Sequence, residues 1–219
     1  VELAGEIRDA FPDKKIAITQ SGKNLIASKY PINPNSTSKK LLSQLQKKNI
    51  EVHLNSRADV DFASFNEAPF KAGQQTIKLS SGKELSVDLV FNCTGASPNS
   101  SFYPESWRDS VGLLKVDSNL KVEGTENVFA CGDVTNVPEL KLAYTVNSAQ
   151  APALTKNIKA FIHGKPLPKV YKAASALMMV VPVGSKGGVL ATKWGTMGAT
   201  IASAAKGKKL FYNMGFEMN

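Results

Sequence analysis

At residues 125–144 the chain reads TENVFACGDVTNVPELKLAY, which predicts a strand, a Gly-Asp turn, a short loop and a helix. Residues 128–131 form a short apolar run between polar residues, which indicates a buried strand. Gly132 lacks a Cβ atom and would let a ligand come close to the backbone, and Asp133 would accept hydrogen bonds from a hydroxyl-rich ligand. Pro138 stands just before a helical pattern, with Glu139 in or near its first turn. The positive end of that helix would therefore face the same place.

This stretch resembles the second flavin-binding segment of flavoprotein reductases that have two dinucleotide-binding domains. Within the pyridine nucleotide-disulfide oxidoreductase-like FAD family, the chain is most similar to one branch. This branch is the AIF-homologous, mitochondrion-associated inducer-of-death or ferroptosis-suppressor-like NAD(P)H:quinone oxidoreductases. Four motifs carry the resemblance, in the family's order and at similar separations: VELAGEI at 1–7, FNCTG at 91–95, NVFACGDV at 127–134 and KLAY at 141–144. It covers most of the chain and weakens after about residue 171.

The resemblance implies an α/β fold, namely part of a two-dinucleotide-binding-domain reductase with a Rossmann-like FAD/NAD(P)-binding architecture and a small α+β C-terminal domain. We expect the remainder of the NAD(P)H-binding domain at 1–97, the C-terminal part of the FAD-binding domain at 98–164 and a C-terminal interface domain at 165–219. The residue patterns predict helices at 1–10, 35–49, 139–163 and 198–205, and strands at 15–19, 50–54, 76–79, 85–88, 88–95, 113–116, 120–122, 128–131, 176–183 and 189–192.

Length and composition are those of a globular protein with one large domain or two small ones. The chain has 219 residues, of which 42% are hydrophobic and 21% charged. It begins with Val1 inside a helical pattern without signal-peptide character, which we interpret as part of a longer chain. The apolar run at 176–183 is shorter than the roughly 20 residues of a membrane-spanning helix.

Two cysteines, Cys93 and Cys131, lie far apart in the sequence. They form no C-x-x-C pair, which removes the redox dithiol of the disulfide-reductase relatives, and no metal-ligand spacing is present. Both sit at the ends of apolar predicted strands, so we expect buried free thiols.

For FAD, the resemblance implies that Asp133 binds a ribityl hydroxyl and that the next helix points its N-terminus at the flavin pyrimidine edge. Lys141 would add a cation that stabilises the negative charge of reduced flavin, although a solvated lysine remains an alternative. Gly95 would give backbone clearance near both cofactors. The residues expected to bind FAD are Gly132, Asp133, Lys141, Leu142, Ala143 and Gly95.

For NAD(P)H, the resemblance places Glu2 near the nicotinamide amide, although Glu2 would also suit the first turn of a helix with no ligand nearby. A carboxylate after the strand at 15–19 would bind the ribose 2′-hydroxyl of NADH. Gln20 and the residues up to Lys23 contain no acid there. Lys23 could bind a 2′-phosphate or be solvated, so we predict weak discrimination between NADH and NADPH.

The expected function is that of an FAD-dependent oxidoreductase, similar to apoptosis-inducing factor, which passes a hydride from NAD(P)H to flavin and electrons on to a quinone or oxygen. No catalytic side chain or metal is required. A formal net charge of +9 leaves open a cell-death effector that binds nucleic acid, and a weak contact with a membrane surface. A third alternative is that the chain is inactive by itself. The expected location is cytoplasmic or mitochondrial.

Overall fold

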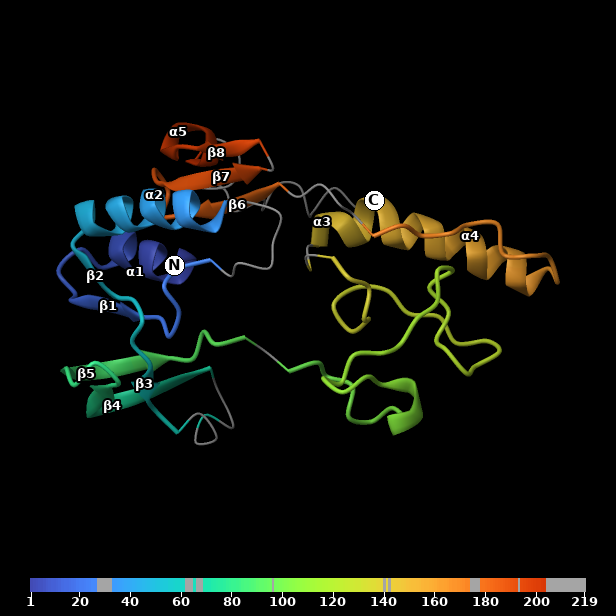
Figure 1. Ribbon diagram of the computed structural model, residues 1–219, viewed down its shortest axis with the longest axis horizontal. Coiled ribbons are helices and arrows are strands. Elements are labelled where there is room, and N and C mark those ends of the chain that lie inside the picture. Colours follow the sequence, from blue (N-terminus) through green and yellow to red (C-terminus); the bar gives the residue numbers. More distant parts are fainter. Residues whose placement is uncertain are drawn as a thin grey trace. The chain divides into compact units, whose positions relative to one another are not determined.

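A computed structural model describes residues 1–26, 33–61, 65, 69–95, 97–139, 141, 143–173, 178–192 and 194–203 (Figure 1). The chain divides into two compact units. The first combines Val1–Cys93 with Ala176–Asn219, and the second is Thr94–Ser175.

The first unit places two helices between two sheets (Figure 1). The first sheet is parallel and sets Ile16 opposite Ile50. The other is antiparallel, in the order β6–β7–β8, and a short helix follows it. The elements are α1 (Glu2–Ala10), β1 (Ile16–Thr19), α2 (Pro34–Lys47), β2 (Ile50–His53), β6 (Met179–Pro182), β7 (Gly188–Thr192), β8 (Gly195–Met197) and α5 (Ala199–Ala202).

Helix α2 supplies the centre of this unit's core. Its N-cap Asn33 accepts a hydrogen bond from the Ser36 amide at 3.0 Å, which satisfies one of the free donors of the first turn. Leu41 and Leu45 are four residues apart and therefore share one helix face. Both are fully buried and pack with β2 and with Val189 of β7. The C-terminal strands thus complete the same core as the N-terminal helices.

Gly5 explains how closely α1 approaches the C-terminal sheet. A Cβ atom at this position would collide with the backbone of Val183 and Gly184, which follow β6. Asp9 at the end of the same helix accepts hydrogen bonds from the amide and hydroxyl of Ser185 at 2.8 and 2.9 Å. These contacts fix the turn between β6 and β7 on α1.

A second antiparallel sheet in the first unit contains the predicted strands at 76–79 and 85–88, which pair as a hairpin. Its strands are β3 (Ala58–Asp59), β4 (Phe70–Leu79) and β5 (Glu84–Phe91), in the order β3–β4–β5. Strand β5 ends at Phe91, whereas the sequence predicted a strand through Gly95. Cys93 therefore lies past the strand and is exposed, so the expectation of a buried thiol is wrong for this residue.

The second unit contains short bridges and turns around two small cores. Val116 pairs with Val122 as predicted, and Leu114, Val122 and Ala130 form one core cluster. The predicted strand at 128–131 is represented by one bridge, between Phe129 and Lys121. The segment does not form a full strand because it bonds a neighbour on one edge, the chain at 120–122. Among the described residues, no strand pairs with its other edge.

The long helix of the second unit begins later than predicted and changes its winding. It runs through α3 (Ala143–Thr145), one turn of π-helix η3 (Val146–Gln150) and α4 (Ala151–Ile162). The sequence predicted a start near Glu139. Pro152 accounts for the π turn, since it has no amide hydrogen and its ring needs room beside the carbonyl four residues earlier.

The unit boundaries differ from the three expected domains. The first boundary falls at Cys93 instead of residue 97, and residues 178–203 pack with the first unit. Residues up to Ala173 pack with the second unit, where Tyr171 and Ala173 contact the core around Leu120. Across the described ranges, every helix is too short or too polar to cross a bilayer.

Candidate functional site

The Gly-Asp turn sits at the end of the segment that pairs through Phe129. Gly132 has φ +81°, a conformation that side-chain-bearing residues rarely adopt. Its carbonyl accepts hydrogen bonds from the amide and hydroxyl of Thr135 at 3.1 and 2.9 Å. Thr135 is fully buried, whereas Asp133 is exposed. The turn is thus fixed from inside and presents a carboxylate on the outside.

The first turns of the long helix lie beside this glycine. A Cβ atom on Gly132 would meet the side chain of Val146 at 3.8 Å, which is an ordinary van der Waals contact. Protein crowding therefore does not require glycine here, while the positive φ does. Ala143 and Asn147 in the same turns are exposed. The helix start and the carboxylate of Asp133 consequently border one surface of the second unit.

Lys141 lies in the loop before the helix and is half-buried. Its Nζ donates to the carbonyl oxygens of Thr135 at 2.6 Å and Val137 at 3.1 Å. Burial lowers the pKa of Lys141, while the nearby carboxylates of Glu139 and Asp133 oppose that shift. The ammonium group thus closes the loop and adds positive charge close to the Gly-Asp turn.

Three side chains that were not among the predicted site residues form a hydrogen-bonded chain to the Gly-Asp turn. They are Gln150, Glu139 and Tyr171. Gln150 is 1% exposed, and its Oε1 accepts the Gly132 amide at 2.6 Å. Its Nε2 donates to Glu139 at 2.5 Å. The Tyr171 hydroxyl lies 2.9 and 2.8 Å from the two Glu139 oxygens. Burial, followed by the Glu139 hydrogen bond, raises the pKa of Tyr171 to about 12.

These residues fit the ribityl chain and pyrimidine edge of a flavin. The exposed carboxylate of Asp133 can accept from a sugar-alcohol hydroxyl, and the helix start and Lys141 supply positive charge beside it. The Gly132 amide is already bound to Gln150, so the polar group that this turn offers outward is the carboxylate.

The residues predicted to bind NAD(P)H lie in the first unit. Glu2 is the first residue of α1. Gln20 follows β1, and its backbone N–H donates to the carbonyl oxygen of His53 at 2.8 Å. Lys23 is exposed in the next loop. Gly95 is exposed with φ +108° and belongs to the second unit. Of the residues predicted to bind FAD, the structure brings together Gly132, Asp133, Lys141 and Ala143. Leu142 lies outside the described residues.

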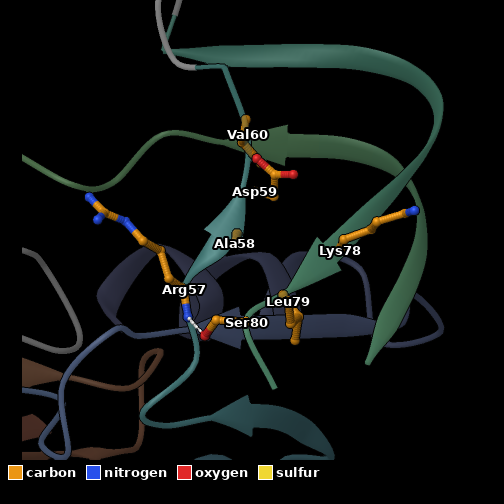
Figure 2. Close-up of a pocket in the computed structure, with 7 residues that line it drawn as sticks. All are labelled: Arg57, Ala58, Asp59, Val60, Lys78, Leu79 and Ser80. Atoms are coloured by element: carbon orange, nitrogen blue, oxygen red, sulfur yellow. Dashed lines mark hydrogen bonds between the residues drawn. The ribbon is translucent and has the colours of Figure 1, made fainter. Parts of the chain in front are cut away.

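A shallow pocket of about 450 Å³ lies elsewhere in the first unit, on the sheet that contains β3 and β4. Figure 2 shows that the side chains of Arg57 and Lys78 point to opposite sides of it. The Arg57 amide donates to the Ser80 hydroxyl at 2.9 Å. None of the predicted site residues lines this pocket, so the Gly-Asp turn remains the candidate site.

The cysteines supply no dithiol. Both are free, and they belong to different units. Burial raises the pKa of the half-buried Cys131, which disfavours the thiolate. In the part of the chain that the structure describes, no group of His, Cys, Asp and Glu side chains is arranged to hold a metal ion.

Comparison with known proteins places these features in a family. The model of a family described as pyridine nucleotide-disulphide oxidoreductase matches residues 1–153. Oxidoreductase ptaL from Pestalotiopsis fici is 32% identical over 86% of this chain and 47% of its own length. Human ferroptosis suppressor protein 1 is 29% identical over 96% of this chain and 55% of its own length. The chain thus spans about half the length of the curated relatives it matches.

Solved structures agree on the fold. An FAD-dependent pyridine nucleotide-disulphide oxidoreductase from Desulfovibrio vulgaris superposes with a TM-score of 0.63 at 17% identity, covering 87% of this chain and 45% of that one. A water-forming NADH oxidase from Lactobacillus brevis, bound to NADH, gives a TM-score of 0.60 at 16% identity and covers 83% and 38%.

Proposed function

We propose that this chain, which belongs to the pyridine nucleotide-disulphide oxidoreductase family, forms part of an FAD-dependent NAD(P)H oxidoreductase. The observation that carries the proposal is the exposed Asp133 on a turn fixed by Gly132, beside the start of the long helix. When bound, FAD would supply the redox chemistry by taking a hydride from NAD(P)H and releasing electrons to an acceptor.

The protein groups would bind and orient the flavin. Asp133 would hold the ribityl chain through a hydroxyl. The positive charge of the helix start and of Lys141 would favour the electron-rich form of the ring system. The carbonyl contacts of Lys141 limit its reach, so we assign it an electrostatic role through space.

We propose that a small electron acceptor, such as a quinone or oxygen, takes electrons directly from the reduced flavin.

The nicotinamide cofactor would bind the first unit without strong selection between NADH and NADPH. Gln20 follows β1 with a neutral amide, and Lys23 is an exposed cation three residues later. Neither would repel a 2′-phosphate. Steady-state kinetics with both cofactors should give kcat/KM values within a hundredfold, and a larger preference for NADH would contradict this assignment.

An absorbance spectrum of the complete purified protein tests the proposal. We expect flavin bands in the wild type and loss of most of the flavin in Asp133→Ala and Asp133→Asn. Glu126→Gln is the matched control, because Glu126 is another exposed carboxylate in the same unit. A folded wild-type protein that does not bind added FAD would refute the proposal, and full flavin content in both Asp133 variants would refute the role of that carboxylate.

A further inference from the structure

We propose that Gln150, Glu139 and Tyr171 are positioning residues, which hold the Gly132–Asp133 turn in the shape that binds the flavin. The inference rests on the proposed function, since it assigns the support of the same site. None of the three side chains needs to touch the cofactor. Their contacts join four separate parts of the second unit: the turn, the loop before the helix, the π turn and the segment after the helix.

The hydrogen bonds fix how the Gln150 amide is oriented. Its oxygen faces a backbone donor, the Gly132 N–H, at 2.6 Å. Its nitrogen faces a carboxylate oxygen of Glu139 at 2.5 Å. The opposite orientation would set a donor against a donor and an acceptor against an acceptor. The amide therefore links Gly132 to Glu139 in one direction only, and neither a carboxylate nor an apolar side chain can replace both bonds.

Tyr171 completes this arrangement by anchoring Glu139. The phenol donates toward the carboxylate at 2.8 Å, and the Tyr171 amide donates to the carbonyl of Ser118 at 2.6 Å. Glu139 is thereby held between Tyr171 and Gln150. The Glu139 carboxylate thus fixes the side-chain amide of Gln150, which in turn holds the Cys131–Gly132 peptide group, one residue before Asp133.

The π turn brings Gln150 to this position. An α-helix advances 100° per residue, and a π turn adds one residue within a turn, so it changes which side chains face inward. Gln150 ends that turn and is 1% exposed, while its neighbours Asn147 and Ser148 face outward. Pro152 stands two residues after Gln150 and favours the irregular winding, because it has no amide hydrogen for a regular helical bond. The π turn thus places the buried side-chain amide of Gln150 against Gly132.

A matched comparison on the same helix can separate positioning from general stability. Asn157 is a second buried amide, fully inaccessible to solvent, and it bonds the carbonyls of Asn119 and Lys169, both at 2.8 Å. It supports the same unit without a recorded contact to the Gly-Asp turn. The test compares Gln150→Leu with Asn157→Leu, and Gln150→Glu with Asn157→Asp, in the complete protein stripped of flavin and titrated with FAD.

We expect both Gln150 variants to raise the Kd for FAD by about tenfold or more. In Gln150→Leu the partly buried Gly132 amide loses its acceptor next to Asp133, and in Gln150→Glu a second carboxylate would face Glu139. The Asn157 variants should unfold at lower temperature and yet bind FAD within about threefold of wild type in their folded range. Tyr171→Phe should give an intermediate increase in Kd, since Glu139 keeps Gln150 as a partner.

The pH profile of Gln150→Glu gives a second readout. The new carboxylate would face Glu139, with the Tyr171 hydroxyl and the Lys141 ammonium as the other polar groups near this carboxylate. Two carboxylates at this distance can share one proton at low pH, which restores a donor, and repel one another when both are ionised. FAD binding by this variant should therefore strengthen several-fold between pH 8 and pH 5.5 relative to wild type.

Two results would overturn the positioning role. One is wild-type FAD affinity in both Gln150 variants. The other is an equal loss of affinity in the Asn157 variants, which would reduce the effect to general destabilisation. A wild-type protein that fails to bind FAD would instead refute the proposed function, and the two failures are therefore distinguishable.

Discussion

Gln44 provides the sharpest test of the first unit, because one side chain of α2 replaces a missing strand partner. Its Oε1 accepts the Gly188 amide at 2.6 Å and its Nε2 donates to the Gly188 carbonyl at 2.9 Å. Strand β8 pairs with Leu190 to Thr192 of β7, so Gly188 lies beyond that ladder. Gly188 faces Pro182 on the other side, and proline has no amide hydrogen to donate.

The substitution Gln44→Leu keeps a side chain of similar size and helix propensity but removes both hydrogen bonds. The Gly188 amide and carbonyl would then lose their recorded partner in a buried position. One unsatisfied buried polar group costs about 1–3 kcal/mol. Since Gln44 is only partly buried and water can reach some of the site, we expect the lower half of the summed range, about 2–4 kcal/mol of unfolding free energy.

Urea unfolding of the complete protein, followed by circular dichroism, measures this change. Gln46→Leu is the control, because Gln46 lies on the same helix and is exposed. We expect the control to stay within about 0.5 kcal/mol of wild type, as is usual for surface sites. Equal midpoints for the two variants would refute the reasoning and would separate residues 188–192 from the core around α2.

Two further predictions concern the second unit. Because Tyr171 has its pKa raised to about 12, the stability this phenol contributes should be present below pH 10 and lost between pH 10 and 12. Solvent screening at the half-exposed ring reduces this contribution to about 1 kcal/mol, and Tyr171→Phe should abolish that part of the slope of unfolding free energy against pH. Gly132→Ala should lower the unfolding free energy by about 1–2 kcal/mol through strain at φ +81°, as measured by thermal or urea unfolding, while a neutral result would mean that the turn relaxes freely.

Local sequence patterns were sufficient for much of the first unit. The residue pattern predicted a helix at 35–49, and α2 runs from Pro34 to Lys47 with Asn33 as its N-cap. The residue patterns also predicted strands at 76–79 and 85–88, which lie within the paired strands β4 and β5. In both cases residues close in sequence supply the contacts that stabilise the element. A short stretch of sequence is therefore enough to predict it.

Long-range contacts account for what the sequence did not reveal. The apolar run at 128–131 matched a strand, but whether it forms one depends on partners elsewhere in the chain. The hydrogen bond between Gln150 and Gly132 follows from the π turn, which a regular 3.6-residue period does not predict. Pro152 was the available signal for that turn.

The start of the long helix shows the same limit. Pro138 and Glu139 form a good start signal, yet the helix begins at Ala143. Glu139 is instead held in the loop by Gln150 and Tyr171, residues up to 32 positions away. A tertiary hydrogen-bond network therefore takes precedence over a local helix preference here.

The core shared by α2 and β7 has a consequence for how the chain is made. Gln44 and Gly188 are 144 positions apart, and the whole second unit is synthesised between them. As the ribosome releases the chain from its N-terminal end, Leu41 and Leu45 emerge long before Val189 can cover them. Until then the early segment keeps an apolar face uncovered. A premature stop codon before residue 178 would leave that face without its partner strands.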